Sequence, residues 1–234
     1  MGASKIEFFF NSAPNPLKVC LFLEESGVEY RAVPIDTKRG DQHTDGYQQI
    51  NPNAKVPAIR DGETVVFDSN AILLYLAEKT GQFLPKDAPT ARGELLSWLM
   101  FIATGVGPYS GQAFHFRNIA PENLPYAIKR YHYEANRHWQ IIDNRLKGRR
   151  YMMGNTYTIL DMAVWGWAPR IPYVLAEDNA FDRFSNIRRL MDKLNARPAA
   201  QRAHDLSQSH AFQTEMDDTA MRNMYPQIFA PATD

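Results

Sequence analysis

Two short segments near the start of the chain carry side chains that suit the binding of an anion. Residues 11–16 hold Ser12 and Asn15 directly before an apolar stretch typical of a helix, so a hydroxyl and an amide stand beside helix N–H donors. Further on, Asp68 and Ser69 end a predicted strand and open a helix, whose N-terminus favours a carboxylate. The simpler interpretations are a turn residue between prolines for Asn15 and N-capping for the other pair.

Cys20 is the single cysteine, which leaves no internal disulfide and no thiolate metal cluster for this chain to form. The six histidines show no spacing typical of a zinc site, so we expect no metal. A lone thiol suits a glutaredoxin-like role, in which it attacks disulfides itself. Cys20 lies inside the predicted helix of residues 17–25, however, whereas a reactive thiol needs exposure and a lowered pKa. Packing in the core is the favoured interpretation.

The overall composition is that of a globular protein without a dominant charge. Of the 234 residues, 44% are hydrophobic and 22% are charged, and 26 Lys and Arg balance 26 Asp and Glu. A nucleic-acid partner is therefore not favoured. No run of about 18 uncharged apolar residues occurs, and the first residues lack the apolar stretch of a secretory signal. We expect a cytoplasmic protein that does not bind membranes.

Strand and helix signals alternate over the first half of the N-terminal region. Residues 6–10 predict a strand, residues 17–25 a helix closed by Gly27, and residues 29–36 a second strand. A polar loop from Thr37 to Gly46 then leads to a short helix that ends near residue 50. The pattern up to this point is βαβα.

A hairpin and a helix complete this region. Residues 56–60 and 64–68 predict two antiparallel strands joined at the Asp61-Gly62 turn, and residues 69–79 predict the helix. The resulting order, βαβαββα, predicts an α/β thioredoxin-like domain over residues 1–80. Folds of this type usually serve thiols.

The remainder of the chain predicts an all-α domain. Two prolines and a glycine in residues 81–90 indicate a linker, and residues 91–203 form the predicted helical domain. Within it, apolar residues recur every three or four positions from Leu124, and Thr158 with Asp161 fits a capping box. The last part, residues 204–234, lacks a sustained period and reads as a C-terminal extension packed on the body.

Several of these segments together resemble the glutathione transferases. The segments are SAPNPLKV at the N-terminus, NPNAKVPAI at 51–59, FDSNAILLYLAEK at 67–79, and the capping box. The order and spacing resemble the family over almost the whole chain. GVGPYSGQ at 105–112 and LPYAIKRY at 124–131 are most similar to the Nu class of glutathione-dependent disulfide-bond oxidoreductases, which itself resembles a fungal nitrogen-regulatory protein.

The resemblance implies how glutathione is held. In the family the bond corresponding to Val56-Pro57 is cis, and the Val56 backbone pairs with the cysteinyl part of glutathione. It further implies that Ser69 holds the γ-glutamyl carboxylate and that Asp68 pairs with the ligand's ammonium group. The family pattern at this point is Glu-Ser, so Asp68 has a shorter reach. By base rates alone, the proline would be an ordinary trans residue.

Three further residues match positions that contact glutathione in the resembling class. Lys55 and Gln42 match contacts to the glycine carboxylate and nearby main chain, although a surface Lys is usually a solvated charge. Arg130 matches an arginine near the site, which in the family can reach glutathione held by the neighbouring subunit of a homodimer. A surface ion pair within its helix is the equal alternative for Arg130.

The catalytic residues are also implied by the resemblance. A free thiol has a pKa near 8.5, so stabilising the glutathione thiolate is the main task. No Tyr precedes Tyr30, which excludes the tyrosine type of transferase. The Nu-like pattern Thr-Pro-Asn is here Ala13, Pro14 and Asn15, so the hydroxyl is missing. Asn15 is therefore the leading catalytic candidate, and Ser12 is the weaker one.

Three functions follow as hypotheses from this resemblance. The first is a glutathione-dependent disulfide reductase, with peroxide reduction as a related capacity. The second is a transferase that conjugates glutathione to electrophiles. The third, motivated by Ala13, is a noncatalytic glutathione-binding regulatory protein. All three use glutathione, as cosubstrate or ligand, and a homodimer is expected from the family.

Overall fold

The computed structural model describes residues 5–85 and 89–229. By its internal contacts the chain divides into two compact units. Unit 1 comprises Met1–Tyr75 together with Arg202–Asp234, and unit 2 comprises Leu76–Gln201. Residues 86–88 of the predicted linker and residues 230–234 of the predicted extension lie outside the described residues. Unit 1 therefore combines the first and the last parts of the chain.

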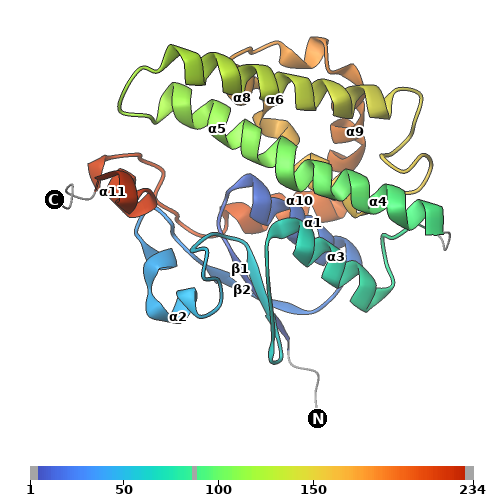
Figure 1. Cartoon of the computed structure of the whole chain (residues 1–234). Helices are drawn as coiled ribbons and strands as arrows, with labels where there is room; N and C mark the ends of the chain where they lie inside the picture. Colours follow the sequence, from blue (N-terminus) through green and yellow to red (C-terminus); the bar gives the residue numbers. More distant parts are fainter. Residues whose placement is uncertain (1–4, 86–88, 230–234) are drawn as a thin grey trace. The chain divides into compact units, whose positions relative to one another are not determined.

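A four-stranded mixed sheet forms the centre of unit 1 (Figure 1). Its strands are β1 (Ile6–Phe10), β2 (Tyr30–Pro34), β3 (Ala58–Asp61) and β4 (Thr64–Phe67). Their order is β2-β1-β3-β4, with β1 parallel to β2 and both other pairs antiparallel. The predicted βαβαββα order and thioredoxin-like sheet are confirmed.

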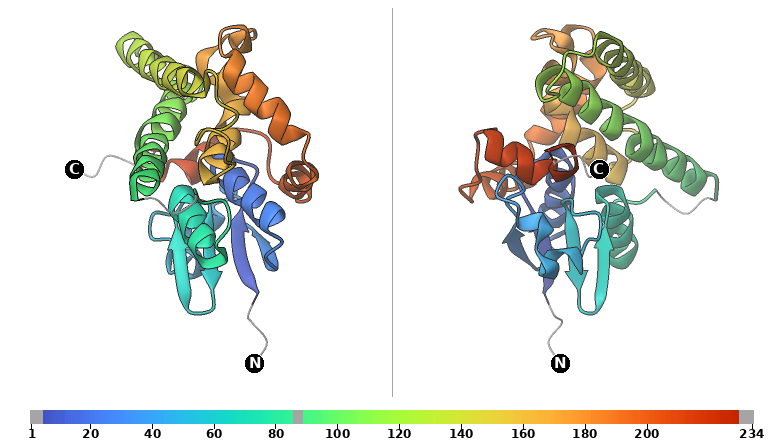
Figure 2. Two further views of the ribbon diagram at one scale, coloured as in Figure 1. Left: turned by 90° about the vertical axis from the view of Figure 1, so that its right-hand side faces the viewer. Right: turned by 60° about the vertical axis from the view of Figure 1, so that its left-hand side comes forward.

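Helices cover both faces of this sheet. In the two views of Figure 2, α2 (Asp45–Gln48) lies on the opposite side of the sheet from α1 (Pro14–Ser26) and α3 (Ser69–Thr80). A 3-10 turn, η1 (Asp41–His43), precedes α2. Side chains on a strand alternate between faces, so the three phenylalanines of β1 are shared between both sides. All three are buried.

The start of α1 differs from the prediction, which placed it at Leu17. The helix begins at Pro14, so Asn15 lies in its first turn rather than in the preceding loop. Proline is well tolerated at the first helical position because its φ is already helical and its missing N–H is not needed there. At the other end, Gly27 adopts a φ of 71° and donates to the Leu23 carbonyl, which confirms the predicted stop.

Unit 2 contains helices and, among its described residues, no strand longer than an isolated bridge. Thr158 and Asp161 form the predicted capping box at the start of α7, where the Thr158 N–H donates to the Asp161 carboxylate at 2.9 Å. A π-helical turn (Ile102–Val106) joins α4 to α5. The main helices are α4 (Pro89–Phe101), α5 (Gly107–Asn118), α6 (Pro125–Leu146), α7 (Ile159–Trp167), α8 (Ile171–Leu175) and α9 (Ser185–Asn195).

The C-terminal part is more helical than its sequence pattern indicated. Helix α10 (Pro198–Gln208) begins at the proline that ends the preceding helix, and α11 (Asp218–Met224) and α12 (Pro226–Phe229) follow. Within unit 1, the Phe212 ring packs edge-on against Phe10, with 5.7 Å between ring centroids. The returning segment therefore completes the hydrophobic core of the N-terminal sheet.

Candidate functional site

The loop before α1 is fixed by Asn11, a residue that the sequence did not single out. Its side-chain oxygen accepts from the Ala13 N–H at 2.9 Å, and its amide donates to the Thr37 hydroxyl at 3.2 Å. Ser12 is exposed, and Asn15 is half-buried. An Asx turn of this kind is visible in a sequence as Asn two residues before the N-cap of a helix, here Ala13, so the signal was present.

The first turn of α1 offers few donors to an anion. Pro14 and Pro16 have no N–H, the Ala13 N–H is bound by Asn11, and the Leu17 N–H donates to the Ala13 carbonyl at 3.3 Å. Ala13, the N-cap residue, contributes no side-chain hydrogen bond. Asn15 and Ser12, the two predicted catalytic residues, carry the polar side chains of this segment that can donate hydrogen bonds.

The Val56-Pro57 peptide bond is cis, as the resemblance implied. The segment before it is held at the Lys55 carbonyl, which accepts from the Tyr47 hydroxyl at 2.7 Å and from the Asn51 amide at 2.6 Å. The Lys55 side chain is exposed, whereas Pro57 is buried. The geometry therefore fixes the backbone of this segment and leaves the Lys55 ammonium in solvent.

Asp68 caps helix α3. One of its carboxylate oxygens accepts from the N–H groups of Asn70 at 2.9 Å and Ala71 at 3.1 Å. Its own φ is 69°, a left-handed conformation that Asp tolerates better than most residues. Because the Asp68 carboxylate occupies two of the helix's N-terminal donors, a ligand carboxylate at this end meets chiefly the N–H and hydroxyl of Ser69.

Ser69 is buried, with 2% of its surface exposed, and a lysine lies beneath it. The Lys18 ammonium donates to the Ser69 hydroxyl oxygen at 3.2 Å, although Lys18 itself is only 1% exposed. Burial lowers the pKa of Lys18 from 10.5 to about 8, against the field of Asp68, which raises it. The sequence did not reveal this residue, because a lysine in a helix is ordinarily a surface charge.

Gln42 is buried, and its partner comes from the C-terminal segment. Its amide donates to the Asn223 carbonyl at 2.9 Å, and its side-chain oxygen has no hydrogen-bond partner among the described residues. His43 contacts the same carbonyl at 2.8 Å, and the Asn223 amide donates to the Lys38 carbonyl at 2.8 Å. Helix α11 is thus tied to the loop that carries Gln42.

Arg130 belongs to unit 2. It forms an ion pair within its own helix, the alternative to a glutathione contact that the sequence left open. It bonds Glu134 one turn along α6 at 2.6 Å, and Arg137 bonds the other oxygen of the same carboxylate at 2.8 Å. Burial raises the pKa of Glu134, but hydrogen bonds and charges from both arginines outweigh it and lower the pKa overall. The remaining predicted site residues all lie in unit 1.

Cys20 is buried, with 3% of its surface exposed, and its thiol donates to the Ala203 carbonyl at 3.7 Å. Burial, together with the nearby Glu24 charge, raises the pKa of the thiol. A buried thiol with a raised pKa is a poor nucleophile. The prediction that Cys20 packs in the core is confirmed.

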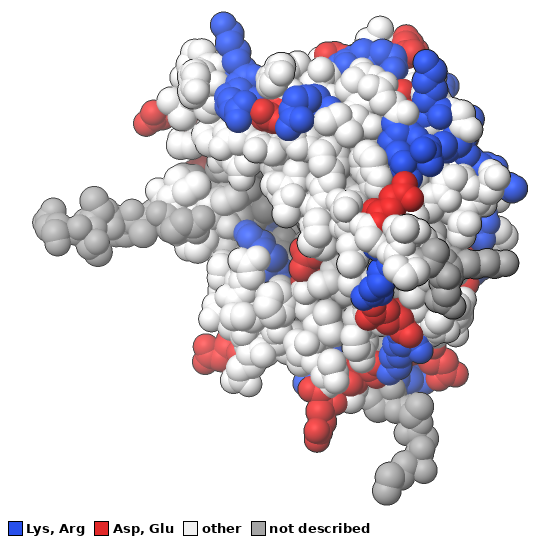
Figure 3. All heavy atoms as spheres, turned by 45° about the vertical axis from the view of Figure 1, so that its right-hand side comes forward, with Lys and Arg blue, Asp and Glu red and all other residues white. Residues whose placement is uncertain are grey.

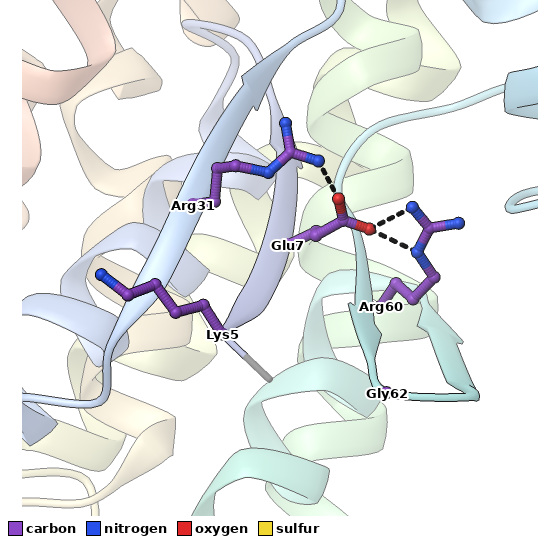
Figure 4. Close-up of a pocket in the computed structure, with 5 residues that line it drawn as sticks. All are labelled: Lys5, Glu7, Arg31, Arg60 and Gly62. Atoms are coloured by element: carbon purple, nitrogen blue, oxygen red, sulfur yellow. Dashed lines mark hydrogen bonds and ion pairs between the residues drawn. The ribbon is translucent and has the colours of Figure 1, made fainter. Parts of the chain in front are cut away.

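A separate pocket lies on the sheet surface of unit 1. Arg31, Glu7 and Arg60 stand side by side on β2, β1 and β3, and the Glu7 carboxylate bonds both guanidinium groups (Figure 4). Lys5 and Gly62 complete the lining of a pocket of about 310 Å³. None of these residues is among the predicted glutathione contacts, and both arginines are substantially exposed. Cross-strand ion pairs of this exposed type contribute little stability.

Charged side chains of both signs lie on the face of the molecule that Figure 3 shows. On this face the basic side chains gather mainly over the upper and right-hand parts, and acidic side chains are more frequent over the lower part. Within residues 5–85 and 89–229, no helix combines the length and apolar character needed to cross a bilayer.

Known proteins are similar to this chain in sequence and in fold. Residues 7–78 match the N-terminal domain of glutathione S-transferases. The chain is 41% identical over 169 residues to the disulfide-bond oxidoreductase YfcG of Escherichia coli strain K12, and the alignment covers 69% of this chain and 78% of the relative.

Two crystal structures of bacterial transferases add to this likeness. A glutathione transferase family member from Pseudomonas fluorescens, with two glutathione bound, is 36% identical at a TM-score of 0.80. The alignment covers 85% of this chain and 92% of the Pseudomonas fluorescens chain. A glutathione transferase from Pseudomonas putida, with one glutathione disulfide bound per subunit, is 33% identical at a TM-score of 0.79. The alignment covers 85% of this chain and 90% of the Pseudomonas putida chain. With these identities over most of both chains, the chain belongs to the glutathione S-transferase family.

Proposed function

We propose that this protein is a glutathione-dependent disulfide reductase. The observation that carries the proposal is the glutathione disulfide held by the Pseudomonas putida transferase, whose fold this chain shares over most of its length. The name of the relative YfcG supports the same chemistry. Because Cys20 is buried and its pKa is raised, the exchanging sulfur is that of glutathione.

Two exchange steps account for the reaction. The thiolate of bound glutathione attacks one sulfur of the disulfide, which forms a mixed disulfide and releases one substrate thiolate. A second glutathione thiolate then attacks the glutathione sulfur of the mixed disulfide and releases the other substrate thiolate. Two glutathione molecules are oxidised to one glutathione disulfide, and the substrate gains two electrons and, from solvent, two protons.

The residues of unit 1 have distinct roles in this proposal. Asn15 donates to the glutathione sulfur and lowers the pKa of its thiol, with Ser12 as a second donor. The Val56 backbone beside cis Pro57 pairs with the cysteinyl part of the ligand. Ser69 holds the γ-glutamyl carboxylate, and Asp68 attracts the ammonium group.

The other contacts complete the glutathione site. Lys55 and Gln42 lie toward the glycine carboxylate, and Arg130 reaches glutathione from the other subunit of a homodimer. The protein works in the cytoplasm, where glutathione is kept reduced. Sedimentation velocity will show a species of twice the chain mass if the homodimer forms.

Turnover assays with purified protein separate the three functional hypotheses. We expect reduction of 2-hydroxyethyl disulfide to exceed conjugation of 1-chloro-2,4-dinitrobenzene, and Cys20→Ala to retain the reductase activity. Conjugation faster than reduction would instead favour the transferase hypothesis. Retention on immobilised glutathione, with disulfide, peroxide and electrophile turnover all at background, would favour the regulatory protein.

A further inference from the structure

The ammonium of Lys18 sits beneath the residue that opens α3, and it is a buried cation with a neutral partner. Lys18 is 1% exposed, and its described hydrogen bond goes to the Ser69 hydroxyl at 3.2 Å. Asp68 is the charged group whose field acts on it, and one oxygen of that carboxylate accepts from the Asn70 and Ala71 N–H groups. Buried charges in proteins are normally paired, so this arrangement suits an anion that arrives from solvent.

The direction of the Lys18–Ser69 bond decides what Ser69 can do. An ammonium group has three donors and no acceptor, so the Ser69 oxygen must accept from it. A serine hydroxyl that accepts still has one hydrogen to donate. With Lys18 protonated, that hydrogen is available to a ligand oxygen. With Lys18 neutral, the amine nitrogen can itself accept the hydroxyl hydrogen and remove this donor.

We propose that Lys18 is a positioning residue that keeps the Ser69 hydroxyl a donor to the α-carboxylate of a γ-glutamyl ligand. The inference rests on the proposed binding of glutathione, because the γ-glutamyl carboxylate is the ligand group assigned to Ser69. The inference goes further because it names the residue that sets the affinity for that carboxylate. It also identifies the proton on Lys18 that controls this affinity. Lys18 acts through Ser69 and through its charge, and it touches neither the sulfur nor the disulfide.

The titration of Lys18 supports this role. Its pKa of about 8 leaves the ammonium mostly protonated at pH 7 and mostly neutral at pH 9. Binding of the γ-glutamyl carboxylate therefore weakens as the pH rises through this range. The carboxylate in turn raises the pKa of Lys18, so the two groups are linked and binding takes up protons near pH 8.5.

The test compares two ligands that both lack an ionisable thiol. One is S-methylglutathione, and the other is its analogue with a 4-aminobutyryl group in place of γ-glutamyl, which keeps the amine and lacks the α-carboxylate. Isothermal titration calorimetry of the full-length protein at pH 6.5 and 9.0 gives both affinities. Lys18→Met is the variant, because methionine has a similar length and no charge. Lys5→Met is the matched control, because Lys5 is an exposed lysine of the same unit.

We expect Lys18→Met to reduce the preference for S-methylglutathione over the analogue by about tenfold at pH 6.5, the size of one hydrogen bond to a charged group. Between pH 6.5 and 9.0, wild type should lose about tenfold more affinity for S-methylglutathione than the variant loses. Lys5→Met should behave as wild type. Equal losses for both ligands at both pH values would show a merely structural role and overturn the inference.

A measurement on wild type alone covers the case in which Lys18→Met does not fold. Calorimetry at pH 8.5 in two buffers of different ionisation enthalpy gives the protons taken up on binding. Both ligands are used here as their N-acetyl derivatives, because the α-ammonium group of S-methylglutathione itself titrates near this pH. N-acetyl-S-methylglutathione should take up more protons than the N-acetylated analogue, and equal uptake would overturn the inference. Absence of any binding to wild type would overturn the proposed function as well, whereas normal disulfide turnover with equal uptake would overturn the role of Lys18 alone.

Discussion

The two helix starts of unit 1 are each proposed to meet a negative group of the ligand, and they are built differently. The start of α1 is neutral: its N-cap is Ala13, two prolines lack an N–H, and its polar side chains are those of Asn15 and Ser12. The start of α3 has a carboxylate cap at Asp68 and the buried Lys18 ammonium. One start offers neutral hydrogen bonds, and the other adds two charges of opposite sign, of which the Lys18 ammonium is the buried one.

This difference suits the two groups that are bound. A carboxylate only has to be held, so a buried cation raises affinity without a chemical penalty. A thiolate has to react, and its nucleophilicity falls as its pKa falls, so the best attacking thiol has a pKa near the ambient pH. Neutral donors lower the thiol pKa modestly and leave the sulfur reactive. Four substitutions test this difference between the two helix starts.

Lys18→Met should have the largest effect, on stability. Folding lowers the pKa of Lys18 from 10.5 to about 8, so between these values the unfolded chain binds more protons and wild-type stability rises with pH. Below pH 8 the full cost of burying the charge is present, on the order of 3 kcal/mol. At pH 7, urea unfolding should therefore show the variant to be more stable. A difference that stays the same at pH 10.5 would contradict this.

Asn15→Ala should lower disulfide turnover by about 100-fold, the typical effect of removing one donor to a developing or stabilised anion. Glutathione affinity should change less than about threefold, because the carboxylate contacts at α3 remain. Steady-state kinetics with 2-hydroxyethyl disulfide and calorimetric titration measure the two quantities. Unchanged turnover would remove Asn15 from the mechanism. Asn53→Ala, an exposed asparagine of the same unit, is the control.

Ser69→Ala should weaken glutathione binding by about 30-fold, since a hydrogen bond to a charged carboxylate contributes roughly 1.5–3 kcal/mol. It should also lower the free energy of unfolding, because the buried Lys18 ammonium loses its partner. Calorimetry and urea unfolding report the two effects. Ser97→Ala, which changes an exposed hydroxyl of α4, should alter neither. Retained affinity would show that the carboxylate binds elsewhere.

Ala13→Thr should have the smallest effect. Ala13 has an extended backbone that threonine accepts without strain, with φ of −77° and ψ of 163°. The added hydroxyl can donate to the sulfur, so the thiol pKa should fall and turnover at pH 6.5 should rise about threefold. A pH–rate profile shows this as a shift of the acid limb to lower pH. An unshifted profile would mean that residue 13 does not face the sulfur.

Local signals in the sequence predicted much of the fold. Gly27, the Asp61-Gly62 turn and the Thr158 cap each act on a few neighbouring residues, and each ends or starts an element where predicted. The start of α1 was wrong because Pro14 and Pro16 were read as part of a turn, although a proline also fits the first helical turn.

The site was harder to predict from the sequence, because its key contacts join residues that lie far apart in the chain. Lys18 and Ser69 are separated by 51 positions, and the burial of a lysine depends on what the sheet and α3 place around it. Likewise, nothing local shows that Asn223 meets Gln42, since 181 positions separate them. Sequence resemblance supplied Ser69 and Asn15 as predictions, and the structure added Lys18 and Asn11.

The return of the C-terminal segment to the first sheet has a consequence for synthesis on the ribosome. Residues Leu76–Gln201, 126 in number, are made between the two parts of unit 1. At about 5–20 residues per second, synthesis of this segment takes roughly 6–25 s, and the sheet lacks its C-terminal contacts during that time. During that time the Phe10 ring has no Phe212 beside it, and the Asp36 carboxylate lacks the Gln213 N–H that later bonds it at 2.8 Å. The nascent N-terminal domain therefore lacks this cover on the Phe10 ring until Phe212 has been made.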